Sequence, residues 1–404
     1  MYGNIIEKGK VYALLKKWAG VCLILIGLFN SVSEAGNRNL VRIIILMTVC
    51  CLFVCPSVRD KIRDYRFMLF LWVAYFLLIT FSAFRTDGGI AGALNRPEYT
   101  LNYTFLLIFA IPLLIDSRKL LERIFLGLLV SMFFNDIAVF WQSYHGVFRP
   151  DGLWNYLMDV ALVYTILLPC VLILLIENKV CHMWFYKLSF ILGIAALILT
   201  NTRGAWAGVA VSCLVALFMC RKYINLKKVA TLILLLVALL GVFALVKPQE
   251  YQRIYSVAQF ATEKHPEGER VLIWTAAVQM MEDYPLTGVG MFNFLQYYRE
   301  YYLSPLSKEG AHSNAHNNFL QIGAENGIAA AILYAAFNIY MLIFAWRRRS
   351  SVFGVMMFSM VLAFNILGLT WYFLELYSSM RVFWLSLGLC LTGMQLEKKD
   401  KSVI

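Results

Sequence analysis

Apolar runs long enough to cross a lipid bilayer recur along almost the whole chain. Each run holds about 18 or more residues, and a helix of that length spans the hydrocarbon core of a membrane. Lipid offers no partner for backbone N–H and C=O groups, so these runs must form helices, which satisfy those groups internally. The sequence therefore predicts an all-α polytopic membrane protein and excludes a soluble globular one. We expect about 12 transmembrane helices, at residues 14–33, 40–58, 66–84, 100–115, 121–142, 156–176, 182–201, 203–220, 228–247, 327–346, 351–370 and 379–396.

Lysine and arginine set the predicted orientation of these helices, because cytoplasmic loops of membrane proteins carry an excess of both residues. Of the 36 Lys and Arg residues, 23 fall in one set of alternating loops, which we place in the cytoplasm together with both termini. The net charge of +12 follows from this bias and does not indicate nucleic-acid binding. Residues 33–35, Ser-Glu-Ala, resemble a signal-peptide cleavage site, but the preceding apolar run is long for a signal and favours a membrane helix.

One loop is far longer than the others and divides the chain into three parts. Residues 1–247 hold the first nine expected helices, 248–326 form an extracytoplasmic loop with short helices, and 327–404 hold the last three helices and a cytoplasmic tail. Loops of this length are commonly functional. The tract 297–302, Tyr-Tyr-Arg-Glu-Tyr-Tyr, fits either an aromatic belt at the membrane surface or a surface that stacks on sugar rings.

Arg203 is the first candidate for chemistry, because it follows an expected helix at its outer end. Gly204 and Gly208 beside it are small and let helices approach closely. A guanidinium fork binds phosphate oxygens through two parallel hydrogen bonds, so Arg203 could bind a pyrophosphate. The alternative is an arginine that only extends to the lipid headgroups. Arg270 and Arg381 are further extracytoplasmic candidates, and Arg85, Arg96 and Arg149 are weaker ones.

His316 is the candidate general base, in the polar segment 311–318. A neutral imidazole can accept a proton from a hydroxyl near pH 7. His312 lies four residues earlier, and Asn317 follows His316 and can orient it by hydrogen bonding. The two histidines also have the spacing of metal ligands, but no third ligand is evident in the sequence, and we expect no metal. A surface histidine without a chemical role is the simpler alternative.

Three carboxylates lie near the outer ends of expected helices, namely Asp136, Asp159 and Glu375. Carboxylates at membrane depth are costly and usually face a cavity or a partner. A structural ion pair with an arginine and a part in catalysis are both open for these residues.

Three short motifs occur in order in the second half of the chain. Residues 202–206 read Thr-Arg-Gly-Ala-Trp, and Trp274 is followed by Pro-Leu-Thr-Gly-Val-Gly at 285–290. His316 and Asn317 are followed by nine residues and Gly327. These motifs resemble the arginine patch, the long-loop segment and the signature H-[NSQ]-x9-G-x-x-[GTY] of the O-antigen ligase family of bacterial envelope enzymes. The last signature position departs from the pattern, because this chain has Ala330.

The resemblance implies a metal-independent, inverting glycosyltransferase on the periplasmic face of the bacterial inner membrane. The donor would be O-antigen on undecaprenyl pyrophosphate, and the acceptor would be the lipid A–core oligosaccharide of lipopolysaccharide. Arg203, Arg270 and Arg381 would bind the pyrophosphate leaving group, and His316 would deprotonate or orient the acceptor hydroxyl. Membrane lipids are expected partners, and no cofactor or nucleic acid is expected.

Two other functions remain open. An O-antigen polymerase of the same family would use the same donor chemistry with another lipid-linked repeat as acceptor. A transporter of lipid-linked sugars would show inverted repeats and broken helices near the middle of the membrane. The sequence shows no clear repeat, and its intramembrane polar residues lie towards one side.

Overall fold

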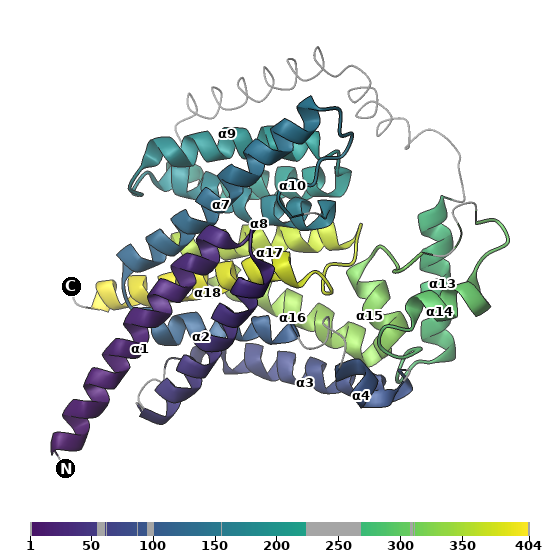
Figure 1. The fold of residues 1–404 in the computed structure, drawn as a ribbon, viewed down its shortest axis with the longest axis horizontal. Helices are drawn as coiled ribbons and strands as arrows, with labels where there is room; N and C mark the ends of the chain where they lie inside the picture. The colour runs from purple at the N-terminus through teal and green to yellow at the C-terminus, as the bar shows by residue number, and fades with distance from the viewer. Residues whose placement is uncertain are drawn as a thin grey trace.

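Helices make up all the regular structure in the described part of the chain, which comprises residues 2–54, 61, 63–86, 88–94, 101–154, 156–223, 268–307, 310 and 312–402 of a computed structural model (Figure 1). The expected helix at 228–247 and Arg96 lie outside these residues. The helices are α1 (Tyr2–Phe29), α2 (Glu34–Val54), α3 (Arg66–Ser82), α4 (Gly89–Leu94), α6 (Leu107–Leu114), α7 (Arg118–Tyr144), α8 (Leu157–Glu177), α9 (Met183–Leu199), α10 (Arg203–Met219), α13 (Glu269–Asp283), α14 (Phe294–Tyr297), α15 (Asn318–Asn326), α16 (Ile328–Arg347), α17 (Val352–Gly368) and α18 (Tyr377–Ser402).

Six of these helices are long and apolar enough to cross a membrane, namely α1, α2, α3, α7, α8 and α16. The chain is therefore a multi-pass membrane protein with an all-α fold, as predicted. Four shorter apolar helices, at Tyr103–Leu114, Met183–Leu199, Arg203–Met219 and Val352–Gly368, coincide with further expected spans. The last three each have 17 residues. They are shorter than the helices expected there, because the chain turns before the apolar runs end.

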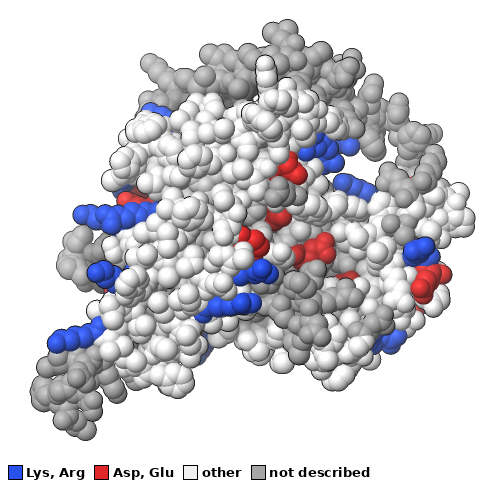
Figure 2. Space-filling model, viewed as in Figure 1, with Lys and Arg blue, Asp and Glu red and all other residues white. Residues whose placement is uncertain are grey.

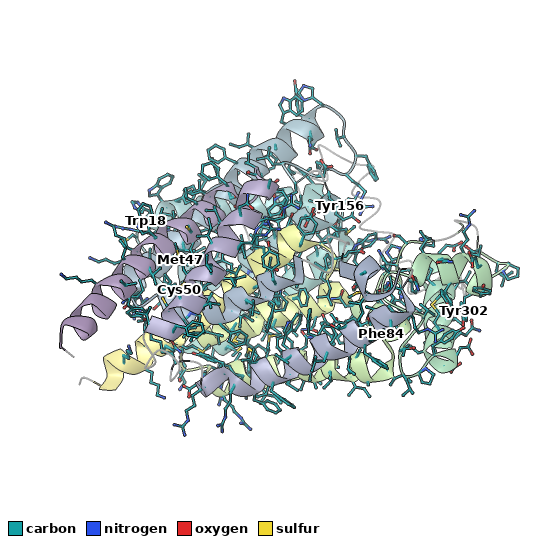
Figure 3. The ribbon with its side chains drawn as sticks, turned by 60° about the horizontal axis from the view of Figure 1, so that its bottom comes forward. Trp18, Met47, Cys50, Phe84, Tyr156 and Tyr302 are labelled. Atoms are coloured by element: carbon teal, nitrogen blue, oxygen red, sulfur yellow. The ribbon has the colours of Figure 1, made fainter. Side chains whose placement is uncertain are left out.

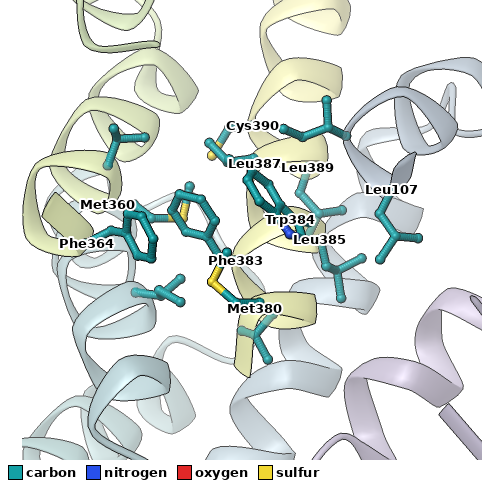
Figure 4. Packing of buried hydrophobic residues seen from close by; sticks show 14 of the residues in the cluster. Leu107, Met360, Phe364, Met380, Phe383, Trp384, Leu385, Leu387, Leu389 and Cys390 are labelled. Atoms are coloured by element: carbon teal, nitrogen blue, oxygen red, sulfur yellow. The ribbon is translucent and has the colours of Figure 1, made fainter. Parts of the chain in front are cut away.

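Helix α8 lies at the centre of the helical body. In its most apolar 18-residue window 89% of the residues are buried, whereas the corresponding share is 28% for α2 at the periphery. Helices α9, α10, α17 and α18 pack against α8. Between α17 and α18, Phe364 stacks on Phe383 with ring centroids 4.2 Å apart, and Trp384 lies beside them (Figure 4). Because lipid tails are as apolar as these side chains, close packing rather than escape from water holds such helices together.

Glycines allow α10 to pack closely on its neighbours. Gly208 lies against the carbonyl of Ala363 in α17, and Gly204 lies directly against the side chain of Thr370. A side chain at Gly204 would overlap Thr370. The absence of a side chain therefore lets the start of α10, which carries Arg203, lie close to the turn between α17 and α18. This confirms the close approach that the sequence predicted for this segment.

A second, smaller core belongs to the loop unit, defined here as residues 268–307 and 312–326. It is formed by Ile273, Ala276, Ala277, Met280, Val289, Phe294, Tyr298, Ala315 and Ala324. In Figure 1 its helices α13, α14 and α15 lie at one end of the molecule, and in Figure 3 Tyr302 marks this end while Trp18 and Met47 lie on the helical body. Tyr298 is buried against Phe294, and the Tyr302 hydroxyl donates to Asp283. Part of the tyrosine tract therefore builds the loop unit, while Tyr301 remains 70% exposed.

Candidate functional site

Helix α15 positions the turn that carries His316. The Asn317 side chain caps its N-terminus by accepting hydrogen bonds from the backbone N–H groups of Phe319 and Leu320, at 2.9 and 3.2 Å. Gly327 ends the helix with φ +87°, a left-handed conformation that favours glycine. The nine residues between Asn317 and Gly327 are therefore the length of α15, which gives a physical reason for the spacing in this motif.

The segment 285–290 fastens α15 to the start of α16. The N–H groups of Val289 and Gly290 donate to the carbonyls of Ala324 and Glu325, at 2.8 and 3.1 Å. The N–H of Ile328 donates back to the Pro285 carbonyl at 2.9 Å. Gly290 has φ +102°, and Gly327 lies so close to the Leu286 carbonyl that a Cβ there would collide with it. The second and third sequence motifs are thus two sides of one backbone contact.

Hydrogen bonds from several parts of the fold hold the turn at His316. Its backbone is left-handed, with φ +50°, an uncommon conformation for a non-glycine residue that is often found at functional sites. Its N–H donates to Asn314 Oδ1 at 3.0 Å, and Asn314 Nδ2 donates to Glu375 at 3.3 Å. Trp274 of α13 donates its indole N–H to the Ala315 carbonyl at 3.0 Å. These bonds fix the turn from both the loop unit and the α17–α18 connection.

Two aromatic rings contact the His316 imidazole. Its Nε2 lies 3.4 Å from Nδ1 of His312. The ring of Trp371 packs edge-on against it with ring centroids 4.2 Å apart. The imidazole is therefore half-buried between a second histidine and an indole, rather than free on a polar surface.

Burial and neighbouring charges disfavour protonation of this imidazole. Burial first, and then the neighbouring His312 and the charge of Arg270, lower the pKa of His316 to about 4. Partial burial and the charge of Arg203 in turn lower the pKa of Arg270. The structure thus brings Arg270 of α13 within electrostatic range of both Arg203 of α10 and His316. Figure 2 shows acidic and basic side chains gathered over the middle of one face, beside the loop unit.

Arg381 is placed differently from these two arginines. It is fully buried, and its guanidinium binds both carboxylate oxygens of Glu34, at 3.1 and 3.2 Å, and Asn30 Oδ1 at 2.8 Å. This fork-to-fork pair ties α18 to the α1–α2 connection. Among the described residues, no carboxylate lies within ion-pair distance of Arg270. The Arg270 guanidinium is therefore better placed than that of Arg381 to bind an added anion.

The three carboxylates near the outer helix ends have separate environments. Glu375 joins the His316 surroundings through Asn314. Asp159 accepts the backbone N–H of Ser379 at 3.1 Å, two residues before Arg381. Asp136 is fully buried between α7 and α8 and accepts the hydroxyl of Tyr164 at 2.6 Å. Within the described part of the chain, Glu375 is the one of the three that hydrogen bonds link, through Asn314, to the backbone of His316.

Several residues of the site are not candidates from the sequence alone, although Asn314 lies within the polar segment 311–318. Asn314, Trp371 and Gln321, whose side chain accepts the Ala315 N–H at 2.6 Å, all support the His316 turn. Glu325 of α15 is buried and accepts the N–H of Phe294 at 3.3 Å. Its burial raises its pKa to about 8, and the charge of Glu375 adds to this effect. A glutamate inside an apolar pattern was the one available sign of it.

Comparison with known families adds an independent finding. The family model described as O-Antigen ligase matches residues 188–335, which include Arg203, Arg270 and His316. This segment of the chain is therefore similar to the O-antigen ligase family. No curated protein matches the chain. The similarity implies an enzyme of O-antigen processing that acts on lipid-linked polysaccharide.

The buried Glu325 predicts a pH-dependent stability. Because its pKa rises from 4.5 to about 8 on folding, the folded protein keeps a proton that the unfolded chain releases. The stability associated with that proton is present at low pH and is lost as pH rises from about 4.5 to 8. We expect the melting temperature of the wild type in detergent to fall between pH 5.5 and 8.5, and that of Glu325→Gln to fall less. Glu300→Gln, at an exposed position, serves as the control, and equal slopes for wild type and Glu325→Gln would contradict the assignment.

Proposed function

We propose that the protein is an O-antigen ligase, which transfers O-antigen polysaccharide from undecaprenyl pyrophosphate to the lipid A–core oligosaccharide of lipopolysaccharide. The observation that carries the proposal is that Arg270 lies within electrostatic range of both Arg203 and His316. Two cations suit a diphosphate, and a neutral imidazole beside them suits the deprotonation of a sugar hydroxyl. The match of residues 188–335 to the O-antigen ligase family model supports the same substrates.

The proposed topology has about 12 transmembrane helices, both termini in the cytoplasm and the loop unit in the periplasm of the inner membrane. The excess of lysine and arginine in alternating loops supports this orientation. It would place Arg203 and His316 on the face where lipid-linked glycans are joined to lipopolysaccharide. No nucleotide sugar is needed there, because the undecaprenyl pyrophosphate is itself the leaving group.

The proposed reaction is a metal-independent, inverting displacement at the anomeric carbon. His316 would accept the proton of the acceptor hydroxyl as its oxygen attacks. Arg203 and Arg270 would bind the pyrophosphate and stabilise the charge that develops as the C–O bond breaks, a kind of effect worth several kcal/mol per donor. For Arg381 we propose an indirect part, because its guanidinium is already bonded to Glu34 and Asn30.

A polymerase of the same family is the second candidate, and one departure from the ligase signature supports it. Ala330 stands where the ligase signature has Gly, Thr or Tyr, and it is fully buried in α16. A polymerase would use the same arginines and base but would accept another lipid-linked repeat. Lipopolysaccharide from a deletion strain separates the two functions: core without O-antigen indicates a ligase, and core bearing a single repeat indicates a polymerase.

Substitutions at Arg203 and His316 test the proposal. His316→Ala should lower transfer by about 10²–10⁴-fold, the usual contribution of a general base. Arg203→Ala should lower it by about 10²–10³-fold, and Arg203→Lys should not restore it, because an ammonium cannot form the two parallel bonds of a guanidinium. Gels of lipopolysaccharide, with lipid-linked glycan extracted in parallel, measure transfer, and immunoblots of membranes measure protein amount. His145→Ala, on an exposed histidine at the end of α7, is the control. Full transfer by both variants would refute these roles.

The low pKa of His316 predicts where activity is lost in acid. Since the pKa is lowered to about 4, the imidazole remains the neutral base well below the ordinary value of 6.5. We expect kcat/KM for transfer by the purified protein to fall only as pH drops through about 4 to 5. A fall centred near 6.5 would show that the base titrates in an ordinary, solvated environment.

A further inference from the structure

The two nitrogens of His316 are not equivalent. Nε2 lies 3.4 Å from Nδ1 of His312, so these two atoms can share one hydrogen. Nδ1 of His316 is buried and has no hydrogen-bond partner among the residues that the structure describes. If Nε2 carries the hydrogen and donates it to His312, Nδ1 presents a lone pair, which is the form that a general base requires.

A second buried polar atom belongs to the ring beside it. Trp371 packs against His316 with the ring planes at 63° and the centroids 4.2 Å apart. Its indole Nε1 is also buried without a hydrogen-bond partner in the described part of the chain. An indole N–H can only donate a hydrogen bond, whereas the His316 Nδ1 lone pair can only accept one. A hydroxyl group is both donor and acceptor, so it can satisfy both atoms at once.

The protein fixes Trp371 in place from both sides. Its neighbour Thr370 packs on Gly204, next to Arg203. Two residues further on, the N–H of Phe373 donates to Asn318 Oδ1 at 2.8 Å, and Asn318 belongs to α15. The segment that carries the indole is therefore tied to the same two elements, α10 and α15, that carry Arg203 and follow the His316 turn.

We propose that Trp371 and His316 form the binding site for the attacking hydroxyl of the acceptor sugar, with His312 as the residue that positions His316. The indole N–H of Trp371 donates to the hydroxyl oxygen, and the hydroxyl hydrogen is donated to Nδ1 of His316. His312 accepts the Nε2 hydrogen and so holds the imidazole in the tautomer with a free Nδ1. This assignment rests on the proposed function and adds which atoms hold the acceptor.

The glycan transfer needs only the donor, the acceptor, His316, Arg203 and Arg270. The acceptor oxygen forms a bond to the anomeric carbon of the donor, while its proton moves to Nδ1 of His316. The bond from that carbon to the pyrophosphate oxygen breaks, and the leaving group takes the electron pair. Arg203 and Arg270 meet the negative charge that it gains, and His316 becomes a cation until it releases the proton to solvent.

Replacement of the indole tests the contact with the acceptor. Trp371→Phe keeps an aromatic ring against His316 but removes the N–H. We expect KM for a lipid A–core acceptor to rise about tenfold, the size of one lost hydrogen bond in a buried site. The affinity for undecaprenyl pyrophosphate, measured alone as a probe of the arginines, should stay unchanged. Trp141→Phe is the matched control, because Trp141 also packs on a histidine, His145, at 4.2 Å but lies outside the site. Unchanged acceptor kinetics for Trp371→Phe would overturn the proposal.

A pair of substitutions at His312 tests the tautomer. His312→Asn places an amide oxygen close to the position of Nδ1 and keeps an acceptor for the Nε2 hydrogen, whereas His312→Leu keeps bulk and removes the acceptor. We expect kcat to stay within about threefold of the wild type for the first and to fall at least about tenfold for the second, with little change in KM. Equal losses in both variants would show that His312 has only a packing role or must itself take the proton, and either result overturns the assignment.

Failure of this inference is distinct from failure of the proposed function. If the wild-type protein in membranes transfers no glycan from the lipid carrier to any acceptor, the proposed function fails. If the wild type transfers glycan and His316→Ala does not, but Trp371→Phe and both His312 variants match the wild type, the proposed function holds and the hydroxyl site is refuted.

Discussion

The close backbone contact between Gly327 and the segment 285–290 is the constraint on which the site depends. It ends α15 after nine residues, so the helix N-terminus and the His316 turn lie at a fixed distance from the start of α16. Any side chain at position 327 would push the Leu286 carbonyl away and strain a backbone at φ +87°. The docking of α15 also buries Asn318, which binds both Tyr334 of α16 and the Phe373 backbone. One glycine thus couples the membrane helices, the loop unit and the candidate base.

The electrostatic design of the site favours a neutral base beside an anion-binding pair. Burial and the nearby cations disfavour the imidazolium, so His316 is neutral across the physiological range. The same burial limits how strongly the imidazole attracts a proton in the free protein. Arg381 shows the opposite solution, since its charge is neutralised by Glu34 within the helical body. Arg270 and Arg381 therefore differ in their surroundings: Arg381 is paired with Glu34, whereas the described ion pairs include no carboxylate for Arg270.

Much of the site could be predicted from the sequence, and the reasons for the rest are physical. Arg203, Arg270 and His316 can be singled out because polar residues are rare in an apolar chain, and the structure places Arg270 within electrostatic range of the other two. Trp371 could not be identified, because an aromatic residue at a helix end is typical of any membrane protein. The partner of Arg381 lies 347 residues away in the chain, beyond what local patterns can indicate. The number of spans stayed approximate, because helices of 17 residues fall at the lower limit of what can cross a bilayer.

The proposed function makes the strength of the base depend on the donor. Arg270 is one of the causes that lower the pKa of His316, and Arg203 acts on Arg270 in turn. A bound pyrophosphate would place negative charge beside both guanidiniums and offset the effect of Arg270 on the imidazole. The pKa of His316 would then rise from about 4 towards its ordinary value, and the imidazole would become a better proton acceptor. Without a donor the base would be weak, so an acceptor hydroxyl held beside it would stay protonated until there is a glycan to attack.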